Sequence, residues 1–166
     1  MIFGRRKEQD PAQPDPLAGN PYLGLRQGFL DLDAELVDAP LRGVALELGT
    51  AGGVATLICV ADGTTSFYLS TGGGFIGAGA HESVRTANAA FCGAVSQQLD
   101  LLLPVADVPL PTQGEINVVA VTDQGPRLLR DLERNAQEST SPSHPLYVAG
   151  QDVITQIRLT SGEQGR

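Results

Sequence analysis

The sequence predicts an α+β fold, in which an antiparallel sheet of about five strands packs with an N-terminal, a long central and a C-terminal helix. Residues 44 to 70 alternate in hydrophobicity around tight turns, which is typical of an antiparallel meander. Residues 81 to 103 carry apolar side chains at helical spacing. The chain has 166 residues, of which 42% are hydrophobic, and this length and composition indicate one domain.

The predicted domain spans residues 20–160, between two flanking segments. Residues 1–19 contain three prolines among polar residues and no apolar periodicity, so we expect a disordered tail. Residues 161–166 are expected to form a flexible C-terminus. The basic cluster Arg5-Arg6-Lys7 lies in the predicted tail, and we interpret it as solvated because three charges are too few to anchor a chain firmly to lipid.

The first predicted helix begins at Asn20-Pro21, a pair typical of an N-cap followed by the first helical position. One apolar stripe follows at spacings of three and four, and it consists of Tyr22, Leu25, Phe29, Leu32 and Leu36. Pro40 ends the segment. Gly24 and Gly28 each weaken a helix by about 1 kcal/mol relative to alanine, and we expect them to let another backbone approach closely.

Residues 43–71 predict a three-stranded meander. In the first strand Val44, Leu46 and Leu48 alternate with Ala45 and Glu47, so one face can hold polar groups. Residues 54–61 are almost wholly apolar, which predicts a central strand buried on both faces. Asp62-Gly63 is a hairpin signal. The second face of the central strand needs a cover, for which a terminal helix or a second subunit is expected, and a homodimer is therefore one expectation.

The second half of the chain predicts a long central helix over 81–103, a strand over 115–122 and two segments with alternatives. Residues 126–136 fit a returning strand, which would complete a hairpin over 115–131, or a helix; the short turn before them favours the strand. Residues 146–159 fit either a helix or a strand. Helical spacing of their apolar residues, together with Pro145 at the start, favours the helix.

The formal net charge of −8 disfavours binding to nucleic acid and to anionic membranes. No apolar run approaches 18 residues, so no membrane-spanning helix is expected. Cys59 and Cys92 lie among apolar neighbours, which indicates packed thiols and a reducing compartment. We therefore expect a bacterial cytoplasmic protein.

The glycine-rich loop over residues 70–79 is the most unusual segment. It contains Gly72, Gly73, Gly74, Gly77 and Gly79, and three of them fit G-x-G-x-x-G between a strand and a helix. Bare backbone amides at a helix N-terminus suit a phosphate. A dinucleotide fold does not fit, because the incoming strand belongs to an antiparallel hairpin and no acid ends a second strand about 20 residues later. The main interpretation is a sharp structural turn; a small anionic ligand is the alternative.

His81, Glu82 and Arg85 open the predicted central helix and complete the candidate ligand-binding set with the five glycines. Glu82 suits the positive end of the helix dipole, and His81 or Ser83 could cap the helix. With Arg85 nearby, the group could bind a small anion or a carboxylate. Capping and a surface ion pair are the simpler interpretation.

No residue pattern predicts catalysis. The two histidines and two cysteines lack the spacing of metal ligands, so neither a metal nor another cofactor is expected. His144 lies near Ser141 and Ser143, but nothing in the sequence marks a partner acid for them.

Two segments, STGGGFIGAGAHESVR (70–85) and YVAGQDVITQI (147–157), resemble a family of small bacterial proteins without an assigned activity, over most of residues 20–160. The element order α-βββ-α-ββ-α also resembles roadblock-like and profilin-like scaffolds, in architecture only. The resemblance implies no activity. The function we expect is a non-catalytic protein-interaction or regulatory module, whose partner is a protein (self or other). The alternative is a small anionic-ligand binder or enzyme that uses the loop 72–79 and the start of the following helix.

Overall fold

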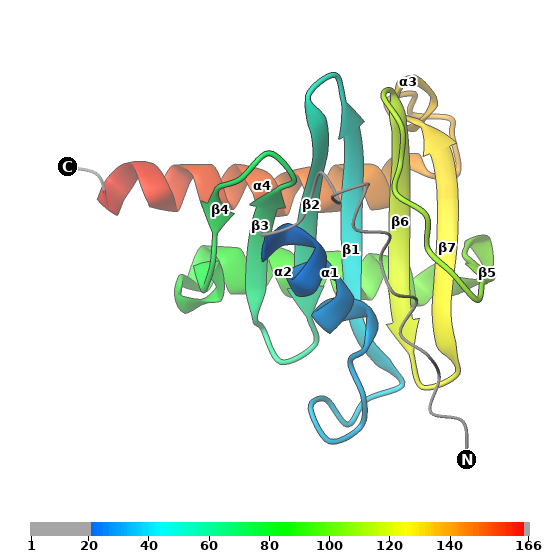
Figure 1. The fold of residues 1–166 in the computed structure, drawn as a ribbon, viewed down its shortest axis with the longest axis horizontal. Helices are drawn as coiled ribbons and strands as arrows, with labels where there is room; N and C mark the ends of the chain where they lie inside the picture. Colours follow the sequence, from blue (N-terminus) through cyan, green and yellow to red (C-terminus); the bar gives the residue numbers. More distant parts are fainter. Residues whose placement is uncertain (1–20, 165–166) are drawn as a thin grey trace, which may run out of the picture.

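The computed structural model describes residues 21–164, so the predicted tail and Arg5-Arg6-Lys7 lie outside the described residues. The elements follow one another in the order α1 (Pro21–Leu30), β1 (Leu41–Thr50), β2 (Gly53–Val60), β3 (Thr65–Leu69), β4 (Gly74–Phe75), the 3-10 helix η1 (Ala78–Ala80), α2 (Glu82–Gln97), the 3-10 helix η2 (Leu99–Leu101), β5 (Leu103–Pro104), β6 (Glu115–Thr122), β7 (Gly125–Leu132), α3 (Glu133–Ala136) and α4 (His144–Gln164) (Figure 1).

The strands form one antiparallel sheet in the order β4-β3-β2-β1-β6-β7-β5. β1 is the central strand, and its Leu46 lies opposite Leu57 of β2 and Val118 of β6. The α+β class and the meander of β1, β2 and β3 are confirmed. The predicted number of five strands was too low, because β4 and β5 have two residues each. Such short strands contain no alternation from which a sequence pattern could be recognised.

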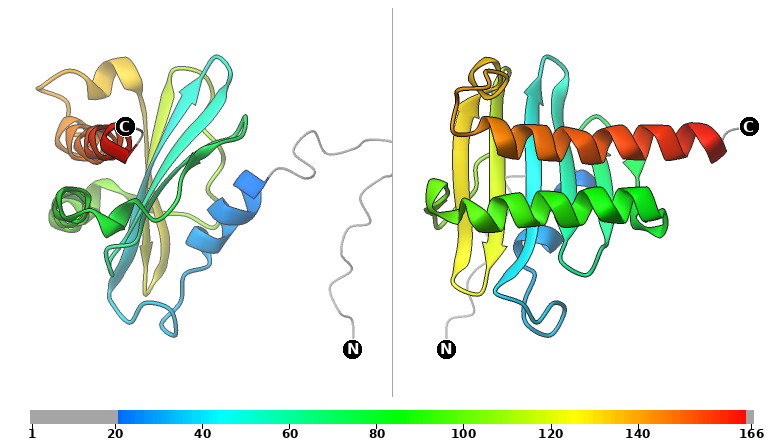
Figure 2. Two further views of the ribbon diagram at one scale, coloured as in Figure 1. Left: turned by 90° about the vertical axis from the view of Figure 1, so that its left-hand side faces the viewer. Right: turned by 180° about the vertical axis from the view of Figure 1, so that it is seen from behind.

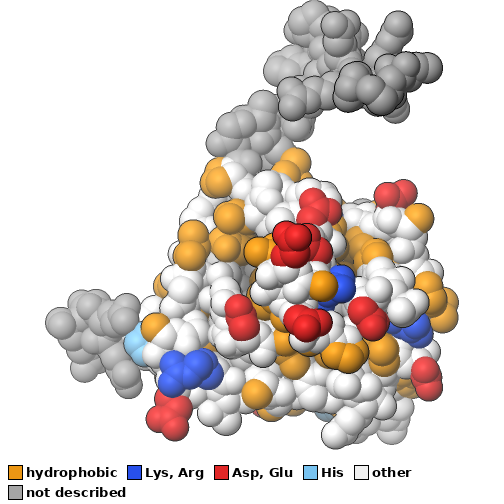
Figure 3. Space-filling model, turned by 90° about the horizontal axis from the view of Figure 1, so that it is seen from below, with side chains coloured by type: hydrophobic (Ala, Val, Ile, Leu, Met, Phe, Trp, Pro, Cys, Tyr) orange, Lys and Arg blue, Asp and Glu red, His pale blue; other side chains and the backbone are white. Residues whose placement is uncertain are grey.

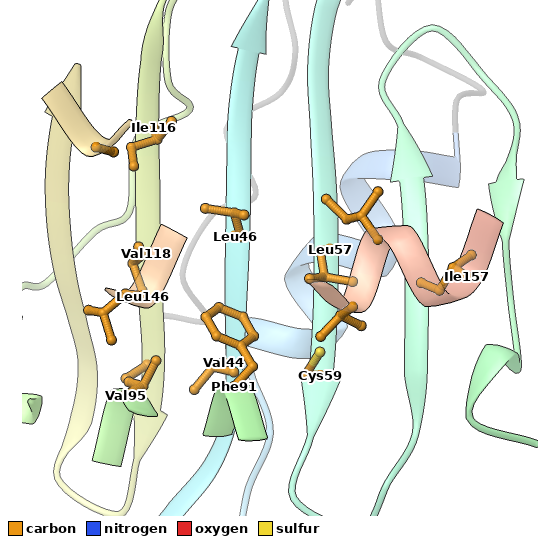
Figure 4. Packing of buried hydrophobic residues seen from close by; sticks show 14 of the residues in the cluster. Val44, Leu46, Leu57, Cys59, Phe91, Val95, Ile116, Val118, Leu146 and Ile157 are labelled. Carbon is orange, nitrogen blue, oxygen red and sulfur yellow. The ribbon is translucent and has the colours of Figure 1, made fainter. Parts of the chain in front are cut away.

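Helices cover both faces of the sheet. α2 and α4 run side by side across one face, and α1 lies on the other (Figure 2). The core under α2 and α4 joins alternate residues of the central strands to the inward side of each helix. The residues labelled in Figure 4 are Val44, Leu46, Leu57, Cys59, Phe91, Val95, Ile116, Val118, Leu146 and Ile157.

The opposite face carries a second apolar cluster beneath α1 and the segment that follows β5. It comprises Phe29, Val37, Ala45, Ile58, Val60, Val108, Val119, Val121 and Leu128. Leu57 and the adjacent Ile58 are thus both buried, on opposite faces of β2. The predicted burial of β2 on both faces is confirmed. Elements of the same chain cover both faces of the sheet. The homodimer stays a prediction, but the sheet does not need a second subunit to cover it.

Two predicted helices were too long. α2 ends at Gln97, and the chain then turns through η2 so that Leu103 pairs with Leu128 of β7 instead of continuing the helix to residue 103. α1 ends at Leu30, and Leu36 of the predicted stripe is 66% exposed. The cause of this exposure is local: the side chain of Asp33 accepts hydrogen bonds from the amides of Glu35 and Leu36 and so stabilises a turn.

The expectation that Gly24 and Gly28 permit a close approach was wrong. A Cβ built at either position would meet no atom of the described residues within 4 Å. The two segments with alternatives adopt the favoured structures, which are a strand after residue 125 and a helix near the C-terminus. Residues 125–132 are strand β7, followed by the single turn of α3, and the C-terminal segment is helix α4, which continues to Gln164.

Candidate functional site

The glycine-rich loop begins as the turn of the β3–β4 hairpin. Gly72 and Gly73 have φ angles of 108° and 87°, a region that L side chains rarely adopt. The amide of Gly72 donates to the carbonyl of Leu69, and the amide of Leu69 donates to the carbonyl of Gly73, at 3.0 and 3.1 Å. These two glycines therefore make a tight turn.

Gly74 and Gly79 let two backbones approach each other. A Cβ at Gly74 would lie 2.2 Å from the carbonyl oxygen of Phe67, and one at Gly79 would lie 2.2 Å from that of Gly63. The first contact seats β4 against β3, and the second seats η1 against the β2–β3 turn. Both glycines are thus required by packing, as the structural interpretation of the loop expects.

Arg85 stabilises the end of the same loop. Its Nη1 donates to the carbonyl oxygens of Gly79 and Ala80 at 2.9 and 2.8 Å. Gly77, with a φ of 72°, precedes η1, and His81 precedes α2. The guanidinium of Arg85, which was a candidate for binding an anion, therefore binds backbone carbonyls.

The loop and the C-terminal half of α4 enclose a groove of about 300 Å³ at the outer edge of the sheet, here called the edge groove. Its lining consists of Gly74, Phe75, Ile76, Gly77, Ala78, Ala80 and His81 from the loop and Ile157, Thr160 and Ser161 from α4. Phe75 is 40% and Ile76 is 75% exposed. The edge groove thus presents two large apolar side chains to solvent.

The structure brings only part of the candidate set together. Gly74, Gly77 and His81 line the edge groove, whereas Gly72, Gly73, Gly79 and Arg85 do not. Glu82 lines a different groove, between α2 and α4, whose other residues are Ser83, Thr86, Ala87, Ala90, Ala149, Asp152 and Gln156. Glu82 and Arg85 therefore do not face one ligand with the glycines.

Sequence reasoning missed a row of polar side chains across the middle of the sheet, on the α1 side. Thr56, Glu47 and Asn117 lie directly opposite one another on β2, β1 and β6, and we call them the polar row. Glu47 is 1% exposed. Its carboxylate accepts hydrogen bonds from Thr56 Oγ1 at 3.3 Å and from Asn117 Nδ2 at 3.0 Å.

α1 completes the polar row from above. Arg26 binds the Glu47 carboxylate through Nε at 2.6 Å and Nη2 at 2.9 Å, and Nη2 also donates to the carbonyl of Val108 at 2.9 Å. The hydroxyls of Tyr22 and Thr56 are 2.6 Å apart. Burial, the largest single influence, lowers the pKa of Arg26, but the hydrogen bonds to Glu47, the negative charge of Glu47 and the interaction with Tyr22 together outweigh it and raise that pKa. The arrangement holds α1 on the sheet, and its sequence signal was a lone acid inside an apolar strand.

A second cluster supplies the acid that the sequence did not mark for Ser141 and Ser143. Ser143 Oγ donates to Asp131 Oδ2 at 2.6 Å, and the two serine hydroxyls are 2.9 Å apart. His144 Nδ1 instead donates to the carbonyl of Ala136 at 2.8 Å. Ser143 is 2% exposed. The cluster therefore fastens the start of α4 to β7 and does not align a nucleophile with a base.

Both cysteines are packed thiols, as expected. Cys59 is buried under α2, and Cys92 Sγ lies 3.4 Å from Asn88 Oδ1. Burial raises the pKa of Cys92 to about 11 and that of Cys59 well above its usual value. Thiols in this state supply little thiolate at neutral pH.

Within residues 21–164, no three histidine, cysteine or acidic side chains come together as metal ligands would. The same part of the chain contains no helix with the length and apolar character to span a membrane. Comparison of the chain with protein-family models, curated proteins and solved structures finds no match.

Proposed function

We propose that this protein is a non-catalytic protein-interaction or regulatory module that contacts its protein partner at the edge groove. The observation that carries the proposal is the exposure of Phe75, on the two-residue strand β4, and of Ile76, which follows it. Contiguous exposed apolar side chains are typical of interaction surfaces. Burial of their exposed parts against a partner would contribute on the order of 2 kcal/mol.

The β3–β4 pairing fixes the orientation of Phe75. Phe75 lies opposite Phe67, which packs against the core under α2 and α4, so the side chains of Phe75 and Phe67 point to the same side of the sheet. The glycine turn and the contact of Gly74 with Phe67 allow little other geometry for β4. A preorganised apolar surface loses little conformational entropy on binding, which favours a docking role.

Charge favours a basic partner. The six acidic residues Asp31, Asp33, Glu35, Asp38, Asp62 and Asp123 are exposed in the α1–β1, β2–β3 and β6–β7 connections. Figure 3 shows acidic side chains gathered on this end of the molecule, which we call the acidic end. Together with the net charge of −8, the acidic end would steer a positively charged protein toward the domain.

The alternative is a small anionic ligand bound in the edge groove. Gly74, Gly77 and His81 line this groove and favour the alternative. The hydrogen bonds of Arg85 to the carbonyls of Gly79 and Ala80 count against it, because they occupy the guanidinium.

Site-specific photo-crosslinking in cells of the native host tests the proposal. Ile76→p-benzoylphenylalanine should give a discrete adduct with a basic protein; an adduct only with a second copy of this chain would contradict the basic partner. The matched control carries the same probe at Leu103, which is 65% exposed and lies on β5 at the opposite edge of the sheet from β4. The adduct should disappear when Phe75→Ser is added and circular dichroism shows the fold intact.

A thermal-shift series with phosphate, nucleotides and carboxylates tests the alternative. A ligand that binds the folded state raises the melting temperature by linkage. A clear shift that is lost in His81→Ala, together with no Ile76 adduct beyond the Leu103 control, would reject the interaction module in favour of the ligand binder.

A further inference from the structure

α1 derives little stability from its own sequence. It has ten residues, and isolated helices of this length are marginal in water. Gly24 and Gly28 each weaken a helix about fivefold in its folding equilibrium relative to alanine. Neither glycine is needed for packing, since no described atom would contact a Cβ there. α1 therefore depends on its contacts with the sheet.

Three of the side chains that make those contacts are buried, and two of the three are polar. Tyr22, Arg26 and Phe29 are the buried residues of α1. The hydroxyl of Tyr22 is hydrogen-bonded to that of Thr56, and the guanidinium of Arg26 donates to Glu47. The middle of the interface between α1 and the sheet therefore consists of hydrogen bonds. Phe29 packs at the lower end, where its Cε2 would lie 3.0 Å from a Cβ at Gly43.

The free-energy cost of detaching α1 from the sheet differs between a polar and an apolar interface. When α1 leaves, Arg26 and Glu47 reach water together, and neither charge stays buried alone. Glu47 can keep its hydrogen bonds to Thr56 and Asn117, which belong to the sheet. A leucine at position 47 would instead leave apolar surface in water. The polar row thus lowers the cost of the state in which α1 is detached.

The rest of the fold does not depend on α1. The core under α2 and α4 uses none of its residues, and the strands pair without it. From this geometry we propose that α1 is a releasable cover, which detaches and unfolds while the sheet, α2 and α4 stay folded. Its release exposes the apolar face that carries Ala45, Ile58 and Val60.

Native-state hydrogen exchange on the full chain tests the proposal. Amides of α1 should exchange at least about 100-fold faster than those of β1. The free energy of the opening that exposes them should depend less steeply on denaturant concentration than the free energy of global unfolding. The double substitution Arg26→Leu/Glu47→Leu should slow α1 exchange at least about tenfold relative to β1. The matched control Arg130→Leu/Glu115→Leu removes an ion pair of 3.1 Å that is partly exposed, and it should leave α1 exchange unchanged.

Thiol labelling gives a second measurement that does not depend on the double variant. Ile58→Cys places a thiol under α1, and the adjacent Cys59 lies on the opposite face under α2. The thiol at position 58 should react with a maleimide at least about tenfold faster than Cys59 under native conditions, by the same opening. Equal labelling rates, or α1 amides that exchange only with the global unfolding of β1, would overturn the proposal.

Discussion

The two faces of the sheet are built from alternate residues of the same strands, yet they are covered in different ways. Under α2 and α4, the central strands present Val44, Leu46 and Leu57 to a core whose centre is apolar. Under α1, the same strands present Glu47 and Thr56 between apolar neighbours. Two helices of 16 and 21 residues cover the first face, and one helix of ten residues covers the second.

The difference shows how helix length relates to the kind of interface. Apolar burial is non-directional and grows with area, so long helices can be held by it alone. A short helix buries little area, and the Arg26–Glu47 pair fixes its position by two directed hydrogen bonds. The α2/α4 face should therefore dominate stability, while the α1 face should determine which part opens first.

Phe91→Ala should have the largest effect, because Phe91 of α2 is fully buried in the core that α2 and α4 form with the sheet. Loss of its ring should reduce the free energy of unfolding by about 3 to 5 kcal/mol. Urea denaturation followed by circular dichroism measures the change. Phe29→Ala on the α1 face is the comparison, and it should cost less because release of α1 limits the loss. An equal or larger cost at Phe29 would contradict the ranking of the two faces.

Arg26→Met should have the next largest effect, since it leaves Glu47 without its cationic partner. Breaking a buried pair costs about 3 to 5 kcal/mol, and we expect about 3 kcal/mol at most because detachment of α1 lets Glu47 reach water. Arg130→Met, which breaks the more exposed pair with Glu115, should cost under about 1 kcal/mol. Denaturant midpoints of the two variants measure the difference in destabilisation between Arg26→Met and Arg130→Met. Similar midpoints would show that Glu47 is not effectively buried.

Asp131→Asn should have a smaller, pH-dependent effect. Partial burial opposes ionisation of Asp131, but hydrogen bonds from Ser143, Asn135 and the Leu132 amide outweigh it and lower its pKa. The stabilisation by Asp131 is therefore complete above the unfolded pKa of about 3.9 and is lost as pH falls through the lower folded pKa.

We expect Asp131→Asn to cost about 1 kcal/mol at pH 7 and the difference from wild type to shrink below about pH 4. Chemical denaturation at a series of pH values measures this. A difference that grows on acidification would have the wrong sign and would reject the role of the carboxylate.

Gly28→Ala should have the smallest effect, and it should be stabilising. The position is helical and open, so alanine should increase the free energy of unfolding by about 0.5 to 1 kcal/mol. Gly74→Ala is the opposite case, because φ is 148° and a Cβ would lie 2.2 Å from the Phe67 carbonyl oxygen. The melting temperature should rise in Gly28→Ala and fall in Gly74→Ala. Destabilisation by Gly28→Ala would show a contact that α1 makes at this glycine.

The parts that the sequence predicted are those encoded by neighbouring residues. The apolar run of β2 predicted its burial on both faces, and the alternation over 115–122 predicted β6. The glycine loop was recognised as a sharp turn for the same reason, since Gly72 and Gly73 are consecutive. Periodicity failed at the end of α2, because leucines continue at helical spacing beyond Gln97, where the helix stops.

The parts that it missed depend on residues far apart in the chain. Arg26, Glu47 and Asn117 meet only after β1 pairs with β6 and α1 docks. Asp131 and Ser143 likewise meet across α3 and the loop that follows it. The exposure of Phe75 and Ile76 was also missed, because an apolar pair beside a turn is as common in a core as at a surface.

The two-residue strands at the ends of the sheet have a consequence for behaviour at high concentration. Gly74 forms half of β4, and Pro104, which has no amide hydrogen to donate, forms half of β5. Neither strand offers a neighbouring molecule the long row of unpaired amides and carbonyls that seeds fibrils. These two edge strands should therefore contribute little to edge-to-edge aggregation, even though the interior strands are rich in valine and leucine.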